Sequence, residues 1–265
     1  MPFSSKDHTF VVCAYKDNAH LEECILSLKN QTVPSTVYLS TSTPSPYIED
    51  ICKRNDVPMF VNTGEKGPAA DWNFAFSQTN TPLVTLAHQD DYYEPNFLET
   101  VISYANRRTD TLILFSDYYE LKLGGVQKTN TLLKIKRILN WPLRFRCFYR
   151  SRFVRRRSLS FGCAICCPAV TLVRPNVGFP VFDETYRNSC DYYTWVLLSK
   201  KRGSFIYIPK MLMAHRIYAE SATTLNLQEN IRKKEDLEIL CTLWPRPVAK
   251  FINHFYAKSE KSNQV

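Results

Sequence analysis

Short apolar runs and amphipathic segments alternate along the first half of the chain. The runs predict buried strands at Thr9–Ala14, Thr36–Leu39, Pro58–Val61, Leu83–Ala87 and Thr111–Phe115. Between them, apolar residues recur at helical spacing, which predicts helices at Asn18–Asn30, Ser45–Asn55, Pro68–Ser77 and Pro95–Arg107. This alternation is typical of βαβ units. It predicts an α/β fold in which helices flank a mostly parallel central sheet.

The second half of the chain is less regular. Apolar runs within Ser158–Val173 are consistent with strands, and Phe205–Ile208 predicts another. Helices are predicted at Cys190–Lys201, Leu225–Trp244 and Val248–Tyr256. We therefore expect one large domain at residues 1–225 and a C-terminal helical extension at residues 226–265.

Ligands of parallel sheets bind beyond the carboxyl ends of the strands, so the segments that follow strands matter most. One such segment is 14–18, and another is 88–91. Neither a Gly-x-Gly-x-x-Gly fingerprint nor a Walker-type Gly-Lys-Ser/Thr loop occurs, which excludes two common classes of nucleotide-binding protein.

Composition narrows the class of protein further. With 45% hydrophobic and 22% charged residues, the chain of 265 residues is expected to fold and not to be disordered. No apolar run is long enough to span a bilayer, and the N-terminus lacks an apolar signal core, so we expect a cytoplasmic protein.

The nine cysteines are irregularly spaced and odd in number, which favours reduced thiols. Cys163-x-x-Cys166-Cys167 has no second pair to complete a zinc site.

The positive charge is concentrated in one part of the chain. The net charge is +9, yet no acidic residue occurs between Glu120 and Asp183, where thirteen Lys and Arg residues lie. Within about 132–161, which we call the basic insert, these cations alternate with aromatic and aliphatic residues. Such a segment suits an anionic membrane surface or a lipid phosphate, and it equally suits a solvated helix face packed on the body. Nucleic acid is not an expected partner, because no nucleic-acid motif accompanies the insert.

Three groups of residues could carry chemistry. Asp90 and Asp91 directly follow a buried strand, where they could bind Mg²⁺ or Mn²⁺ or simply stabilise the start of a helix. Asp191 opens a predicted helix and could be a general base or a helix-terminal charge. His215 and Arg216 could be a metal ligand and a phosphate clamp, or structural residues.

Taken together and in this order, the motifs of residues 8–225 resemble the family-2 glycosyltransferases of bacterial surface-polysaccharide synthesis, which have the GT-A fold. The resemblance is carried by the segments Phe10–Asn18, Leu21–Thr32 with its Ser-Leu-x-x-Gln-Thr pattern, Gly67–Ala75, Leu86–Pro95 and Cys190–Trp195.

The resemblance implies inverting transfer of a sugar from a nucleoside-diphosphate sugar to a hydroxyl of a lipid-linked glycan acceptor at the inner face of the cell membrane. Asp191 matches the catalytic base, and Asp90 matches the ligand of the divalent metal. Residues expected at the donor are Tyr15, Asn18, Asn73, Asp91 and Arg216.

The chain departs from the family pattern at four places. His88 replaces the first Asp of the metal motif, and Ser40–Thr43 lacks the Asp often used on the base. Cys190 replaces a Glu. Tyr218 stands where the family has a metal-binding His, so His88 and His215 are further candidate metal ligands. These departures leave an alternative open, a catalytically weak subunit that serves another transferase as a binding or scaffold partner. A nucleotidyltransferase is a weaker third hypothesis, because the basic phosphate loop is missing.

Overall fold

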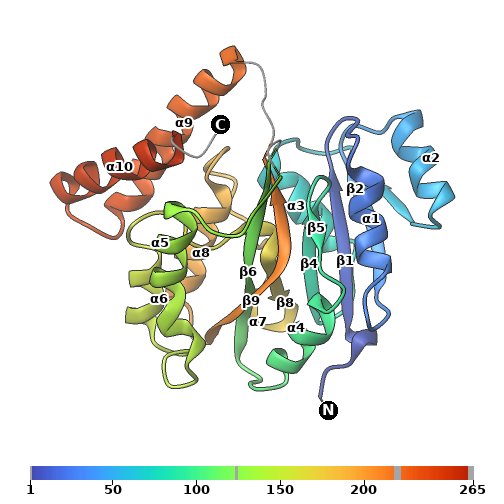
Figure 1. Cartoon of the computed structure of the whole chain (residues 1–265), viewed down its shortest axis with the longest axis horizontal. Coiled ribbons are helices and arrows are strands. Elements are labelled where there is room, and N and C mark those ends of the chain that lie inside the picture. Colours follow the sequence, from blue (N-terminus) through green and yellow to red (C-terminus); the bar gives the residue numbers. More distant parts are fainter. Residues whose placement is uncertain (1, 123–124, 218–221, 262–265) are drawn as a thin grey trace.

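The computed structural model describes residues 2–122, 125–217 and 222–261 of the chain (Figure 1). The α-helices are α1 (Leu21–Lys29), α2 (Pro46–Arg54), α3 (Pro68–Ser77), α4 (Phe97–Ala105), α5 (Thr131–Asn140), α6 (Arg152–Ser158), α7 (Arg174–Val177), α8 (Cys190–Lys200), α9 (Ala222–Cys241) and α10 (Arg246–Lys261). The strands are β1 (His8–Ala14), β2 (Thr36–Thr41), β3 (Met59–Val61), β4 (Leu83–His88), β5 (Tyr92–Tyr93), β6 (Thr111–Lys122), β7 (Gly125–Gln127), β8 (Val170–Val173) and β9 (Ser204–Arg216). Short 3-10 turns are η1 (Ser5–Asp7), η2 (Trp141–Arg144) and η3 (Cys167–Ala169).

The described strands form one sheet in the order β3-β2-β1-β4-β8-β6-β9-β5, and β7 pairs with β6. Strands β1 to β4 pair in parallel, as do β6 and β9. This confirms the α/β fold with a mostly parallel sheet. Strand β8 lies antiparallel between β4 and β6, which the local sequence pattern did not predict.

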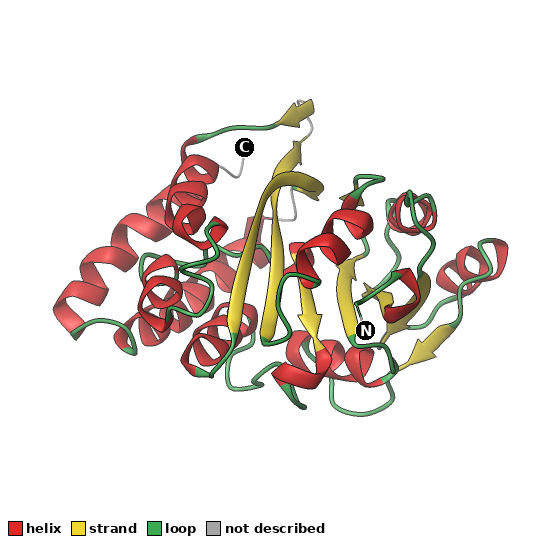
Figure 2. Ribbon diagram, turned by 90° about the horizontal axis from the view of Figure 1, so that it is seen from below, coloured by secondary structure: helices red, strands yellow, loops and turns green. Residues whose placement is uncertain are grey.

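Helices cover both faces of the sheet (Figure 2). Side chains of a strand alternate between faces, and β1 shows the division. Phe10 and Val12 belong to the hydrophobic cluster built with α1, α2 and α4, whereas Val11 belongs to the cluster built with α3 and α8. The parallel strands are therefore buried on both sides, which explains why their sequences read as nearly continuous apolar runs.

Several predicted elements differ in extent. Strand β6 continues from the predicted Thr111–Phe115 to Lys122, and β9 continues from the predicted Phe205–Ile208 to Arg216, because their parallel ladder resumes after an irregularity opposite Asp117. Within Ser158–Val173 only β8 is a strand. The preceding residues form an irregular segment between Gly162, which has φ +124°, and η3.

The segment between α9 and α10 packs against the last residues of the basic insert, which contains α5, η2 and α6. The Trp244 ring lies 5.9 Å from that of Phe161, and the Arg157 guanidinium lies 4.3 Å above the Trp244 ring. The Tyr256 ring of α10 fills the space over Gly162. Whether residue 225 is a domain boundary stays a prediction. Every helix in the described ranges is too short or too polar to cross a membrane.

Candidate active site

Asp91 is the buried member of the adjacent carboxylates that follow β4. Its side chain has no exposed surface, and its Oδ1 lies 3.0 Å from Nδ1 of His215. The same oxygen accepts a hydrogen bond from the Arg216 backbone amide at 3.0 Å. Burial lowers the pKa of His215, but the neighbouring Asp91 carboxylate raises it more, so that its pKa lies above the usual value. Asp91 therefore joins the carboxyl end of β4 to the end of β9.

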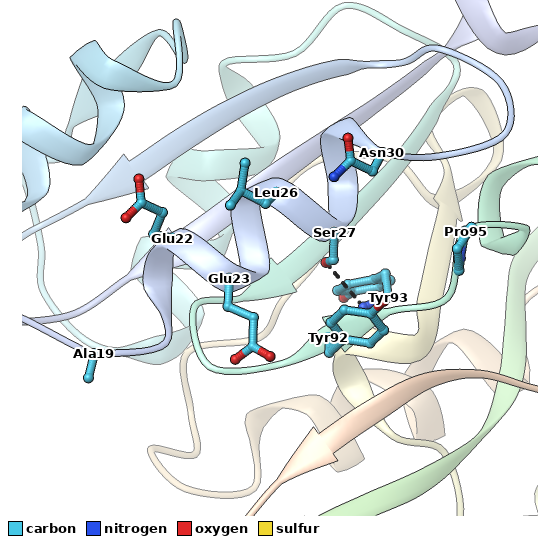
Figure 3. A pocket seen from close by; sticks show the side chains of 9 residues that line it. All are labelled: Ala19, Glu22, Glu23, Leu26, Ser27, Asn30, Tyr92, Tyr93 and Pro95. Carbon is cyan, nitrogen blue, oxygen red and sulfur yellow. Dashed lines mark hydrogen bonds between the residues drawn. The ribbon is translucent and has the colours of Figure 1, made fainter.

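Arg216 connects this junction to α1. Its Nε donates to the backbone carbonyl of Asp90 at 2.9 Å, and a terminal nitrogen donates to the Glu23 carboxylate at 2.7 Å. Glu23 also lines a pocket of about 380 Å³ between α1 and β5, together with Glu22 and Tyr92 (Figure 3). Two carboxylates at this pocket disfavour a phosphate ligand there, so the pocket lies beside the candidate site and is not the place we expect for a diphosphate.

Two buried polar atoms next to Asp90 have no hydrogen-bond partner among the described residues. They are Oδ2 of Asp91 and Nε2 of His88. The His88 ring stacks on Trp72 of α3, with ring centroids 5.3 Å apart and an interplanar angle of 18°. Buried polar atoms are normally satisfied, so atoms left without a protein partner are suited to contact a ligand.

Asp191 lies in the first turn of α8, the helix that precedes β9 in the chain. Burial raises the pKa of its carboxyl group, although the Arg232 cation, the Tyr192 backbone amide, His88 and Lys136 act in the opposite direction. A raised pKa makes the carboxylate a better proton acceptor, as a general base requires.

Electrostatic interactions connect the two acidic groups. Asp191 interacts with His88, which is two residues from Asp90, and also with Lys136. Lys136 in turn interacts electrostatically with His215, which is bound by Asp91. Asp90 also influences the pKa of His215. His88 and Lys136 thus interact electrostatically with Asp191, and each is close to the residues at the end of β4 or β9.

Residues 9–174 match the model of glycosyl transferase family 2. The chain belongs to this family. The match ends before Asp191, so the family assignment and the position of Asp191 are independent observations.

The fold of this family-2 glycosyltransferase is GT-A, as its resemblance to solved structures shows. The match to the mannosyltransferase PcManGT from Pyrobaculum calidifontis in complex with GDP-Man and Mn²⁺ covers 97% of this chain and 70% of that one, with 13% sequence identity and a TM-score of 0.65. The match to S. aureus TarS 1–349 in complex with UDP-GlcNAc covers 93% of this chain and 70% of that one, with 14% identity and a TM-score of 0.59. The match to glucosyl-3-phosphoglycerate synthase from Mycobacterium tuberculosis with Mn²⁺, UDP and phosphoglyceric acid covers 88% of this chain and 78% of that one, with 12% identity and a TM-score of 0.56. No curated protein sequence matches the chain.

Two residues expected at the donor of the glycosyltransferase, Tyr15 and Asn18, differ in their surroundings. Tyr15 is exposed, and its backbone exchanges two hydrogen bonds with the Gln89 side chain, of 2.8 and 3.2 Å. The Asn18 side chain accepts from the His20 amide at 2.8 Å, and the Asn18 carbonyl accepts from the Leu21 amide, so Asn18 supports the start of α1. Tyr218, at the position of the family's histidine, lies outside the described residues.

Asn73 is turned into the protein. Its Oδ1 accepts from the backbone amides of Val181 and Phe182 at 3.0 and 2.9 Å, and its Nδ2 donates to the Phe182 carbonyl at 2.8 Å. Both ends of the amide are thereby occupied. In this arrangement Asn73 ties α3 to the segment that leads to α8, and we propose this positioning role in place of the donor contact expected from the sequence.

Sequence reasoning missed two acidic residues of α9. Glu235 accepts three hydrogen bonds of 2.9–3.0 Å from the consecutive backbone amides of residues 187–189. Asp236, which is buried, accepts from the Ser189 hydroxyl at 2.8 Å. These contacts fix the segment just before Asp191. No local signal links residues so far apart in sequence, so only the fold could identify them.

One of the insert's arginines is not at the surface. Arg155 is fully buried, and its guanidinium donates to the carbonyls of Ser199 and Gly203, each at 2.8 Å, and also to that of Lys201. It therefore stabilises the C-terminus of α8 and is removed from the set of cations expected to meet a membrane. Large side chains of the insert and α10 remain exposed, namely Ile138, Trp141, Phe145, Phe148, Phe153, Val248, Phe251 and Phe255.

Proposed function

We propose that this enzyme transfers a sugar, with inversion, from a nucleoside-diphosphate sugar to a hydroxyl of a glycan acceptor. The observation that carries the proposal is the match of residues 9–174 to glycosyl transferase family 2. The buried Asp91 at the end of β4, which contacts His215, and the raised pKa of Asp191 support it.

In this mechanism Asp191 accepts the proton of the acceptor hydroxyl while the oxygen attacks the anomeric carbon from the face opposite the leaving diphosphate. Its partly buried position raises the basicity of the carboxylate, and the start of α8 holds it in place. The backbone of 187–189 is fixed by Glu235, which limits the freedom of Asp191.

The residues at the end of β4 fit a divalent cation. No group of three His, Cys, Asp or Glu among the described residues forms a complete metal site, but Mg²⁺ or Mn²⁺ on a diphosphate needs only one or two carboxylates from the protein. Asp90 and the unpartnered Oδ2 of Asp91 would hold the ion, with Nε2 of His88 as a further ligand. The bound ion would neutralise charge on the leaving diphosphate. His215 is less suited, because its Nδ1 is engaged by Asp91.

A lipid-linked acceptor at the inner face of the cell membrane, in the synthesis of a surface polysaccharide, agrees with the exposed residues of the insert and α10. On α10, Phe251 and Phe255 are 65% and 55% exposed, and their rings are 4.8 Å apart. Phe153 of α6 is 69% exposed and lies beside Arg157. Aromatic side chains flanked by cations are typical of surfaces that bind anionic lipid.

Release of the nucleoside diphosphate from a panel of nucleotide sugars tests the enzymatic proposal, with Mn²⁺ or Mg²⁺ present and again with a chelator. We expect release with a subset of donors, loss of activity on chelation and a loss of at least about 100-fold in Asp191→Asn and Asp90→Asn. Full activity of Asp191→Asn would exclude Asp191 as the base. No binding of any donor by calorimetry would favour the scaffold alternative, which nothing in the site otherwise favours.

Co-sedimentation with vesicles tests the membrane proposal. Vesicles that contain phosphatidylglycerol should bind the chain in a salt-sensitive way, and Phe251→Ser with Phe255→Ser should weaken this binding. Equal binding to neutral phosphatidylcholine vesicles would contradict the proposal.

A further inference from the structure

Lys136 is a cation at an inward-facing position of α5. Leu133 and Asn140, which lie three residues before it and four after it on the same helix face, are both buried. Lys136 itself is partly buried, whereas Lys134 on the same helix is exposed. A lysine is rarely placed toward the interior unless something pairs with its charge.

Within the described residues, no carboxylate lies at ion-pair distance from Lys136. Its ammonium donates to the Tyr118 hydroxyl at 3.0 Å and lies 5.6 Å from the centroid of that ring. The next residue provides a contrast, since Arg137 forms an ion pair of 2.6 Å with Asp117. A half-buried cation held only by a neutral hydroxyl carries a desolvation cost that an anionic ligand would offset.

The helix face that carries Lys136 lies beside the start of α8. Asn140, on the same face, donates to the Ala164 carbonyl at 2.8 Å, and Sγ of the adjacent Cys163 lies 4.0 Å from Oδ2 of Asp191. The Tyr118 ring that Lys136 contacts lies 6.3 Å from the His215 ring at the end of β9. Lys136 is therefore a cation close to both the candidate base and the end of β9, and an anionic ligand would supply the charge partner that no carboxylate of the described residues provides.

We propose that Lys136 binds a phosphate group of the acceptor and thereby orients the acceptor hydroxyl toward Asp191. This inference rests on the proposed function, because it takes Asp191 as the base that marks the acceptor side of the site. The diphosphate of the donor is assigned to the end of β4, so the acceptor is the source of phosphate that fits the position of Lys136. The substrate class is then a phosphorylated or phosphate-linked glycan acceptor.

Calorimetry with inorganic phosphate and the full chain tests the assignment. We expect wild-type protein to bind phosphate, Lys136→Met to bind it at least about tenfold more weakly, and the matched control Lys134→Met to bind it as wild type does. Unchanged phosphate affinity in Lys136→Met, or no binding by wild type at equal ionic strength, would overturn the proposal. Lys136→Arg keeps the charge and should retain binding, and Tyr118→Phe removes only the hydroxyl, so the result does not depend on one variant folding.

A second titration distinguishes phosphate bound at the acceptor position from phosphate bound at the donor position. The titration is repeated with UDP or GDP at saturation in the presence of Mg²⁺. Phosphate that still binds, with Lys136→Met again weaker, supports the acceptor assignment. Phosphate that is displaced by the nucleotide would place Lys136 at the donor and overturn it. Phosphate binding without cleavage of any nucleotide sugar would instead reject the proposed transferase activity and leave the anion site in place.

Discussion

The Glu235 carboxylate accepts a hydrogen bond from the Ser189 backbone amide at 2.9 Å, two residues before Asp191. The same carboxylate also accepts from the amides of Arg187 and Asn188, so one side chain of α9 immobilises the entry to α8. A charged acceptor for three amides at a helix start is favourable both as hydrogen bonding and with respect to the helix dipole.

Replacing Glu235 should therefore reduce turnover more than donor binding. In Glu235→Gln we expect kcat to fall about 10- to 100-fold, because Asp191 loses its fixed position, while KM for the nucleotide sugar changes little. Steady-state kinetics measure both. Lys234→Gln, at an exposed neighbouring position, serves as the control. A rise in KM at constant kcat would show that Glu235 supports donor binding instead.

Burial of Arg155 gives a prediction about stability. Arg155→Met leaves the carbonyls of Ser199, Lys201 and Gly203 without their donor, and we expect a loss of about 3 kcal/mol or more in the free energy of unfolding. Arg156→Met, at a more exposed position, should change it by about 0.5 kcal/mol or less. Urea denaturation followed by circular dichroism measures the two values. Similar values for both variants would contradict a structural role for Arg155.

A methyl group at Gly162 would collide with α10. A Cβ there would overlap the Tyr256 ring, whereas at Gly125 it would meet nothing within 4 Å. Both glycines have positive φ, +124° and +109°, so Gly125→Ala controls for backbone strain. We expect Gly162→Ala, unlike Gly125→Ala, to detach α10 and to speed hydrogen exchange in residues 246–256. Equal exchange in the two variants would mean that α10 does not depend on this contact.

His8 should make stability depend on pH. Burial lowers its pKa to about 3, while its ring nitrogens lie 2.9 Å from the hydroxyls of Ser35 and Thr85. At pH values below about 6.5, the pKa of His8 in the unfolded chain, the unfolded chain binds a proton that the folded chain does not. Stability is therefore lost as pH falls from about 6.5 toward 3, by about 1.4 kcal/mol per pH unit from this group.

Urea denaturation at several pH values in that window measures the slope. His8→Gln removes the titrating group and should show a shallower dependence, even though the variant is less stable at neutral pH. An unchanged slope would assign the pH dependence to other groups.

Local sequence pattern predicted most elements of the fold because their periodicity is set by burial on the sheet. Helix α3 begins and ends at the predicted residues Pro68 and Ser77. The antiparallel insertion of β8 and the continuation of β9 to Arg216 were not predicted, since both depend on pairing with distant β6. The hydrophobic pattern within a strand does not show which strands lie beside it in the sheet.

For the candidate site, the sequence identified the acidic residues but not their environments. Asp90 and Asp91 are identical in local chemistry, and only the fold shows that His215 holds Asp91. Asn73 fits a donor-binding motif, yet its amide is bound by the backbone of 181–182. Glu235 and Lys136 gained their importance from contacts with residues far along the chain, which no local motif reports.

The family match ends at residue 174, between the acids that follow β4 and Asp191 of α8. Under the proposed mechanism, the leaving group is handled by the matched portion, and proton removal by the portion that follows it. Changes in residues 175–261 would then alter which hydroxyl is glycosylated while the residues that hold the diphosphate stay intact. In enzymes built this way, differences in acceptor should follow differences in the residues beyond the family match.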